Sequence, residues 1–192
     1  MKDKPTGAGR SSFDLVDVGE LFLALELSPG DVFIDLGSGA GAYALAAVEH
    51  VTDQGVIYAV DLWEEGTERL RSELERRQIG NVYPSTADIS KRIPLEDGTV
   101  DVGLISSVLH DLVRDGTHES ALREVRRVLK AGGRLAVVEF KKLAGSPGPP
   151  VEVRLSPEEV ESLLRPHAFE VVATVDVGPY HFLSMFVVKS KD

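Results

Sequence analysis

The chain of 192 residues contains no cysteine, which excludes disulfide bonds, thiolate metal sites and cysteine nucleophiles. It also lacks any apolar run close to the roughly 20 residues that span a bilayer, and no apolar stretch follows the charged start as in a secretory signal. Basic residues are outnumbered, and the net charge of −10 disfavours nucleic acid or an anionic membrane as a partner. We expect a cytoplasmic protein with no metal site and no membrane insertion.

The composition is that of one globular domain. Hydrophobic residues make up 43% of the chain and charged residues 27%, and the length suffices to bury a substantial core. The first twelve residues are polar and rich in glycine and serine. We therefore expect a flexible leader over residues 1–12, followed by a single domain over residues 13–192.

Helical and strand patterns alternate along the chain, which predicts a parallel sheet covered by helices on both faces. The apolar spacing predicts a helix at 13–27 that Ser28-Pro29-Gly30 ends. Further helices are expected from the glycine-rich turn to about 51, at 64–78, around 121–129 with closure by Gly132-Gly133, and from Pro157 onward. The expected strands are 32–36, 56–60, 82–87, 100–108, 134–140, 170–177 and 181–189.

The position of Pro84 indicates the order of the strands. Proline cannot donate a ladder hydrogen bond, so the strand 82–87 belongs at an edge, as it does in a doubly wound sheet of order 3-2-1-4-5. Only Gly178-Pro179-Tyr180 separate the last two strands. A parallel crossover needs a dozen or more residues, so these strands must form an antiparallel hairpin.

A glycine-rich turn, GSGAGA at 37–42, follows the first strand and admits two interpretations. Gly37, Gly39 and Ala42 fit the dinucleotide fingerprint, with Asp61 about 20 residues later at the position of a ribose-binding acid. The second interpretation adds Asp35 and Gly41 and predicts a binding loop for S-adenosylmethionine, which carries an ammonium and a sulfonium but no phosphate. A carboxylate there would attract an ammonium and repel a pyrophosphate, and the terminal hairpin also argues against a nicotinamide-binding fold.

The chain resembles the class I S-adenosylmethionine-dependent methyltransferases, in a pattern similar to the small-molecule branch with the ubiquinone and menaquinone methyltransferases. The matching stretches are DLGSGAG (35–41), VIYAVDLWEE (56–65), TADISKRIPLEDGTVDVGLISSVLHDL (86–112) and LREVRRVLKAGGRLAVVEF (122–140). The resemblance implies a Rossmann-like doubly wound α/β sheet, a single domain of strand order 3-2-1-4-5-7-6 with strand 7 antiparallel. It also implies S-adenosylmethionine as the cofactor and a small molecule as the methyl acceptor.

The resemblance further implies which residues hold the cofactor. Asp61 would take the ribose hydroxyls or, alternatively, cap a helix, and Asp88 would pair with the adenine amino group or shape a turn. Trp63 is as easily a packing residue as an adenine contact, and Tyr43 is as easily packed in its helix as placed over the sulfonium. The implied cofactor-binding residues are Asp35, Gly37, Ser38, Gly39, Gly41, Asp61, Leu62, Asp88, Ile89 and Ser106.

His110 and Asp111 follow the fourth strand, where the resemblance places the methyl acceptor. A histidine there could remove a proton from a hydroxyl or amine, but relatives also use it for packing, and methyl transfer does not require a base. The acceptor site would be formed by the N-terminal helix and the loops 107–117 and 141–152. Because the second loop is short, we expect an open site, a small acceptor, or a second subunit that completes the cover in a homodimer.

Two other functions remain open at this point. A catalytically inactive S-adenosylmethionine-binding sensor or partner protein would have the same cofactor residues, because a fold does not fix a function. A nicotinamide oxidoreductase is disfavoured by Asp35 and the hairpin. Arsenite methylation, which relatives perform, relies on cysteines that this chain lacks.

Overall fold

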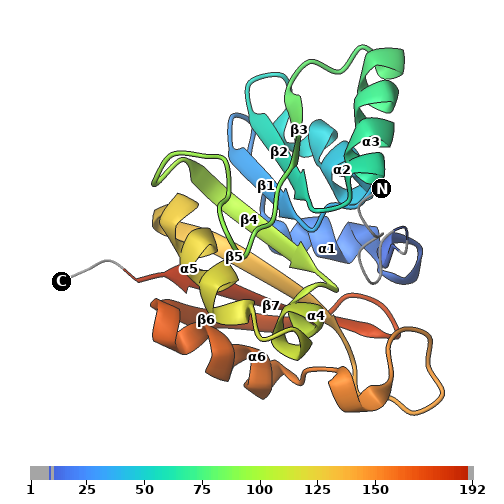
Figure 1. Ribbon diagram of the computed structural model, residues 1–192, viewed down its shortest axis with the longest axis vertical. Helices are drawn as coiled ribbons and strands as arrows, with labels where there is room; N and C mark the ends of the chain where they lie inside the picture. The colour runs from blue at the N-terminus through green and yellow to red at the C-terminus, as the bar shows by residue number, and fades with distance from the viewer. Residues whose placement is uncertain (1–8, 10, 190–192) are drawn as a thin grey trace.

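The computed structural model describes residues 9 and 11–189, and within them one seven-stranded sheet lies between two layers of helices (Figure 1). The strand order is β3-β2-β1-β4-β5-β7-β6, and β7 alone runs antiparallel to its neighbours. The predicted Rossmann-like sheet and its order are therefore confirmed. The strands are β1 (Val32–Leu36), β2 (Val56–Asp61), β3 (Val82–Thr86), β4 (Val100–Ser106), β5 (Leu129–Phe140), β6 (Phe169–Asp176) and β7 (His181–Val188).

Two apolar cores form, one on each face of the sheet. Helices α1 (Val18–Leu25), α2 (Ala42–Val51) and α3 (Glu64–Arg77) cover one face. The other face is covered by α4 (Leu109–Arg114), α5 (His118–Val128) and α6 (Pro157–Leu164), as Figure 1 shows. In α5 the buried stripe is the one expected from its spacing, and Ser156 begins α6 with the predicted capping box. Among the described residues, no helix combines the length and apolar character that a membrane crossing requires.

Pro84 lies in the edge strand β3, as predicted. β3 pairs only with β2, so the missing N–H of Pro84 removes no bond from the sheet interior. The C-terminal hairpin is also confirmed, since β6 and β7 pair antiparallel across the short connection at 177–180.

The helix expected at 13–27 is wrong in its bounds. A 3-10 turn, η1 (Phe13–Leu15), comes first, and α1 begins only after Asp17, whose side chain accepts a hydrogen bond from the Glu20 N–H. The backbone N–H of Asp17 instead binds the Val177 carbonyl at 3.0 Å. This contact with the C-terminal hairpin interrupts the helix, and the helical spacing of the apolar residues does not reveal it.

Two further expectations are corrected. The helix around 121–129 does not continue to Gly132-Gly133 but ends at Val128, and β5 begins at once. The pairing of β4 with β5 shifts between Val100 and Val102, so the glycines lie in a bulge, where Gly132 has a φ of 74°. The loop expected at 107–117 contains α4, because β4 ends at Ser106 and Ser107 turns the chain with a φ of 57°.

The segment between β5 and α6 contains one short 3-10 turn, η2 (Val151–Val153), and is organised by Arg154. The Arg154 side chain is 3% exposed and donates hydrogen bonds to four carbonyls of 141–147, to the Pro149 carbonyl and to the Ser146 hydroxyl. Its guanidinium carbon also lies 5.4 Å from the centre of the Phe140 ring. A loop rich in proline and glycine is thus fixed by one buried cation.

The predicted division into a leader over 1–12 and a domain over 13–192 remains a prediction. Residues 1–8 and 10 of the leader and 190–192 of the domain lie outside the described residues. Ser12, the last residue of the predicted leader, is buried against the domain.

Replacement of Arg154 by lysine is expected to lower the free energy of unfolding by about 2 kcal/mol or more, because a lysine cannot supply the planar set of donors and hydrogen bonds to a charged group contribute about 1.5–3 kcal/mol each. Urea unfolding followed by circular dichroism measures this change. The matched control is Arg165→Lys, whose side chain is 72% exposed and pairs with Glu161. Equal stability of the two variants would refute the role given to Arg154.

Candidate active site

The predicted site residues gather where the parallel strands end. In the sheet register Leu36 of β1 lies beside Val60 of β2 and Ile105 of β4. The turn after β1, Asp61 at the end of β2 and Ser106 at the end of β4 therefore meet at one edge. This edge contains the point where the strand order reverses, between β1 and β4, which is where doubly wound sheets bind ligands.

The three glycines of the turn all have positive φ, but for different reasons. Gly37 has a φ of 76°, and a Cβ there would lie 2.5 Å from a Val108 methyl group. Gly41, with a φ of 81°, packs in the same way against Leu70. Gly39 has a φ of 56°, yet a Cβ there would meet no atom within 4 Å. The backbone at Gly39 therefore faces open space that a ligand can approach closely.

Asp61 fixes this turn by two hydrogen bonds. One carboxylate oxygen accepts the Gly39 N–H at 2.7 Å, and the other accepts the Trp63 N–H at 2.6 Å at the start of α3. The capping role that the sequence left open is therefore present. A carboxylate has about four acceptor sites, so capacity remains for ribose hydroxyls, and that role remains a prediction.

Asp35 is a buried carboxyl group with no cationic partner among the described residues. It is 1% exposed, and its side chain accepts one hydrogen bond, from the Ala44 N–H of α2 at 3.2 Å. Burial, together with the negative charge of Asp61, raises the pKa of Asp35 to about 7, although the bond from Ala44 acts in the opposite direction. A ligand that brings an ammonium would supply the missing charge, so this acid and the open face of Gly39 fit the methionine end of the cofactor.

Three hydroxyls link the N-terminal segment to the site. The Ser12 hydroxyl lies 2.9 Å from the Tyr43 hydroxyl and 3.1 Å from that of Ser106. Tyr43 is 5% exposed and meets the Phe13 ring edge-on at 5.1 Å between centroids, so it does pack in its helix. Ser12 was missed in the sequence because a serine in a polar leader carries no local signal.

The residues expected around the adenine lie close to the turn. Ala87 donates its N–H to the Asp61 carbonyl, which brings Asp88 to the end of β2. Asp88 accepts bonds from the Ser90 N–H and hydroxyl, an Asx turn, and this is the alternative that the sequence left open. Leu62 is 54% exposed and available to a ligand, whereas Ile89 and Trp63 are buried. The adenine contacts remain predictions.

His110 and Asp111 lie at the start of α4, and His110 has a partner that the sequence did not reveal. The Nδ1 atom of His110 lies 2.7 Å from a Glu139 carboxylate oxygen, and the other oxygen accepts the His110 backbone N–H at 3.1 Å. Glu139 is fully buried near the end of β5. A glutamate in the apolar run RLAVVEF was the available signal. Asp111 pairs instead with Arg114.

A groove of about 550 Å³ lies elsewhere, between the C-terminal half of α3 and β3. Its walls include Leu74, Gln78, Ile79 and Tyr83, and none of the residues predicted for the site lines it. Because no predicted site residue lines this groove, we do not assign it as the active site.

A buried acid without a cationic partner and an open glycine turn lie together at the switch point of a doubly wound sheet, which defines a Rossmann-like class of α/β domains. The family model described as a methyltransferase domain matches residues 34–137, more than half of the chain. The chain belongs to this family and is a class I S-adenosylmethionine-dependent methyltransferase domain.

Individual relatives agree with this assignment. The chain is 35% identical over 127 residues to a ubiquinone/menaquinone biosynthesis C-methyltransferase of Hydrogenovibrio crunogenus. The aligned region covers 62% of this chain and 47% of that protein. It is 28% identical to an arsenite methyltransferase of Halobacterium salinarum, over 70% of this chain and 32% of that protein. The chain thus spans less than half the length of these two relatives. A solved S-adenosylmethionine-dependent methyltransferase from Aquifex aeolicus has a TM-score of 0.84 and 28% identity, with 95% of both chains covered.

Replacement of Gly66 by alanine is expected to disturb the glycine turn after β1. Alanine normally stabilises a helix by about 1 kcal/mol relative to glycine. Here a Cβ would lie 2.7 Å from the Gly39 carbonyl oxygen and 2.4 Å from the Trp63 ring. We expect lower stability and weaker S-adenosylmethionine binding, measured by thermal unfolding and calorimetry. The control is Gly19→Ala in α1, where a Cβ would come no closer than 3.4 Å to an Asp17 carboxylate oxygen, and it should change neither stability nor binding in this way.

The raised pKa of Asp35 predicts a dependence of both stability and binding on pH. The folded protein binds this proton more tightly than the unfolded chain, so Asp35 lowers stability as pH rises from about 4 to about 7. Asp35→Asn should be more stable than the parent at pH 8, by an amount on the order of a few kcal/mol, and this gain should fade toward pH 5.

Ligand binding should follow the opposite course. An ammonium prefers the ionised acid, so the affinity of the parent for S-adenosylmethionine should fall as pH drops below about 7, and Asp35→Asn should bind weakly throughout. Thermal unfolding and calorimetry at pH 5–8 measure the two effects. The exposed Asp53→Asn variant is the control, and a parent whose affinity does not change with pH would contradict this account.

Proposed function

We propose that this protein transfers the methyl group of S-adenosylmethionine to a small-molecule acceptor. The observation that carries the proposal is the pair formed by the buried, cation-free Asp35 and the open backbone at Gly39. A pyrophosphate would place negative charge beside this acid, whereas an amino-acid ammonium would neutralise it. The name of the Hydrogenovibrio relative makes a quinone-type ring one acceptor to test.

In this proposal the cofactor supplies a methyl group already activated for displacement, and the chain supplies position and exclusion of water. Asp35 and the turn from Gly37 to Gly41 hold the amino-acid end. Asp61 accepts the ribose hydroxyls while it keeps its bonds to Gly39 and Trp63. Fixed alignment of donor and acceptor contributes about 7–11 kcal/mol in well-oriented intramolecular reactions, which is enough to make positioning the main contribution.

The acceptor would lie between η1, Ser106, the start of α4 and the loop at 141–152. Only η2 interrupts that loop, so no folded cap covers this side in the described residues. Leu143 in that loop is 43% exposed and offers apolar surface to an acceptor or to a second subunit. A homodimer, and a cytoplasmic location inferred from the cysteine-free composition, are part of the proposal. Sedimentation with and without cofactor tests the first.

Calorimetry with S-adenosylmethionine and with NAD tests the choice of ligand. The parent should bind the first and not the second. Asp61→Ala should weaken S-adenosylmethionine binding by more than about tenfold, because a hydrogen bond to a charged group contributes about 1.5–3 kcal/mol. Asp97→Ala, at a side chain 79% exposed, should change little. Tight binding of NAD would overturn the proposal.

A screen with radiolabelled methyl groups over quinols, phenols, amines and small peptides separates an enzyme from an inactive sensor. The absence of a folded cap in 141–155 is the observation that favours a sensor, because an acceptor would then be poorly shielded. Label in a small-molecule product supports the enzyme. Cofactor binding without label in any product supports the sensor.

A further inference from the structure

Glu139 and His110 form a buried pair at the carboxyl ends of β5 and β4, on the side assigned to the acceptor. One oxygen of Glu139 lies 2.7 Å from His110 Nδ1, and the other accepts the backbone N–H of the same residue at 3.1 Å. Both carboxylate oxygens of Glu139 therefore bind His110, and they fix the imidazole ring relative to the backbone of the same residue. Glu139 is 0% exposed, and among the described residues its only ionic partner is His110.

The pair fixes the tautomer of the histidine. An ionised carboxylate only accepts hydrogen bonds, so Nδ1 must carry the proton and, in the neutral ring, Nε2 must carry the lone pair. Within the described part of the chain, Nε2 takes part in no hydrogen bond. Its nearest charged neighbour is an Asp111 oxygen at 3.7 Å, which Arg114 holds at 2.5 Å. Nε2 is thus the ring atom that remains available to a substrate.

We propose, on the basis of the function proposed above, that Glu139 is a positioning residue that directs His110 Nε2 to take a proton from the acceptor. The acceptor would then belong to the compounds that carry an ionisable O–H or N–H group. A lone pair of the acceptor forms the bond to the methyl carbon while the methyl–sulfur bond breaks and its electrons stay on sulfur. The acceptor proton moves to Nε2, and the imidazolium that results lies against the Glu139 carboxylate.

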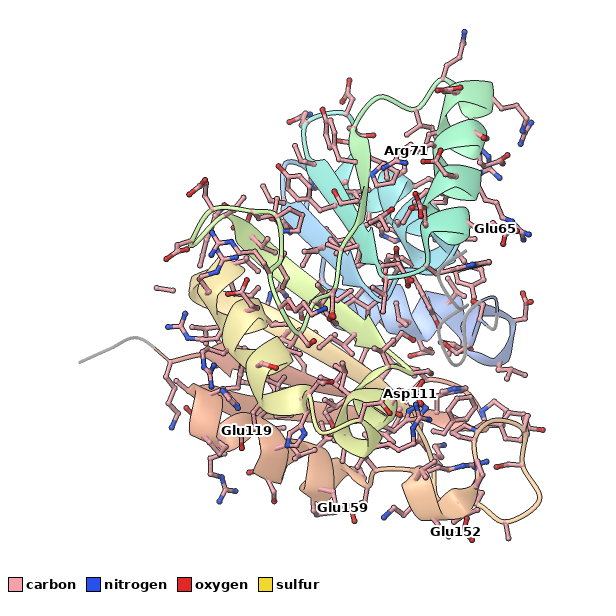
Figure 2. The ribbon with its side chains drawn as sticks, in the orientation of Figure 1. Glu65, Arg71, Asp111, Glu119, Glu152 and Glu159 are labelled. Carbon is pink, nitrogen blue, oxygen red and sulfur yellow. The ribbon has the colours of Figure 1, made fainter. Side chains whose placement is uncertain are left out.

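The charges around His110 agree with this role. Burial lowers the pKa of His110, but the hydrogen bond and charge of Glu139, together with the charge of Asp111, outweigh burial and the opposing charge of Arg114, so the pKa is raised. Besides β5, the elements η2 and α5 pack against α4. The titratable and charged residues are Glu152 on η2 and His118, Glu119, Arg123, Glu124, Arg126 and Arg127 on α5. Glu119 and Glu152 are exposed, and Figure 2 shows both well away from Asp111.

Nuclear magnetic resonance of the imidazole nitrogens tests the hydrogen bond between Glu139 and His110 in the absence of any acceptor. In the parent, His110 should carry its proton on Nδ1 when neutral and titrate above the ordinary histidine range. Glu139→Gln should lower the pKa of His110, and Glu139→Asp should restore part of the difference. His110→Gln identifies the signal among the five histidines. A proton on Nε2, or an unchanged titration in Glu139→Gln, overturns the proposal.

The matched control is Glu124→Gln, the same substitution at a carboxylate 14% exposed that binds Arg127 and the Ile93 N–H, outside the site. It should lower stability and leave the titration of His110 unchanged. A purely structural pair at Glu139 would behave as Glu124 does in the activity measurements below. This control therefore separates positioning from packing.

Activity is measured with the phenol 2-naphthol, 1,4-naphthohydroquinone and imidazole as proton-bearing probes, and with dimethyl sulfide as a probe with no proton to lose. We expect transfer to a proton-bearing probe, a fall in kcat of at least about tenfold in Glu139→Gln, and a larger fall in His110→Gln. The acidic limb of the pH profile should move to lower pH in Glu139→Gln. The affinity for S-adenosylmethionine, measured by calorimetry, should change less than about twofold, on the same argument that these side chains act on the acceptor.

The two proposals fail in different ways. A parent that binds no S-adenosylmethionine refutes the proposed function, while the nitrogen spectra still report on the hydrogen bond between Glu139 and His110. Transfer to a proton-bearing probe with no loss in His110→Gln, or an equal loss with dimethyl sulfide, refutes the proton-accepting role and leaves the methyltransferase intact.

Discussion

The carboxylate of Asp61 connects the two halves of the proposed cofactor site. It lies at the end of β2, yet it holds the Gly39 N–H of the turn after β1 and the Trp63 N–H at the start of α3. The open conformation of the glycine turn therefore depends on a residue from the neighbouring strand. Gly66 lets α3 approach the Gly39 carbonyl, so turn, strand and helix form one closely packed unit. A cofactor that binds Asp61 then meets a site whose shape is set before it arrives.

Much of this arrangement can be predicted from the sequence, because it rests on local patterns. The strand at 32–36 is flanked by turn residues, Pro84 requires an edge, and the short connection at 178–180 permits only a hairpin. Asp35 lies near the end of the first strand, and the glycines follow that strand directly. Each of these features depends on residues a few positions apart, so a single sequence suffices to find them.

The features that were missed depend on contacts between distant residues. The break at Asp17 needs Val177, and Ser12 acquires its role from Tyr43 and Ser106. Glu139, the partner of His110, is 29 positions away in the chain, on a strand whose neighbouring residues are apolar core residues. The bulge at Gly132 takes its form from pairing with β4, although two glycines after a helical pattern read equally well as a helix end. Only the assembled sheet distinguishes these cases.

Glu139 and Phe140 are consecutive in β5, so their side chains point to opposite faces of the sheet. On one face His110 has a carboxylate beside it, whereas on the other His181 lies against the Phe140 ring at 4.0 Å, and burial lowers its pKa to about 4. The same strand end thus holds a histidine that readily becomes charged and another that stays neutral under ordinary conditions.

Arg154 also limits how the acceptor side can adapt. Its donors bind five carbonyls and a hydroxyl of the segment 141–149. Local unfolding of part of this segment would leave the buried guanidinium without hydrogen-bond acceptors, which is costly. We therefore expect this segment, which joins β5 to α6, to move as one unit wherever the acceptor side changes shape. A longer segment here would therefore need other hydrogen-bond acceptors for the guanidinium or a different residue at this position.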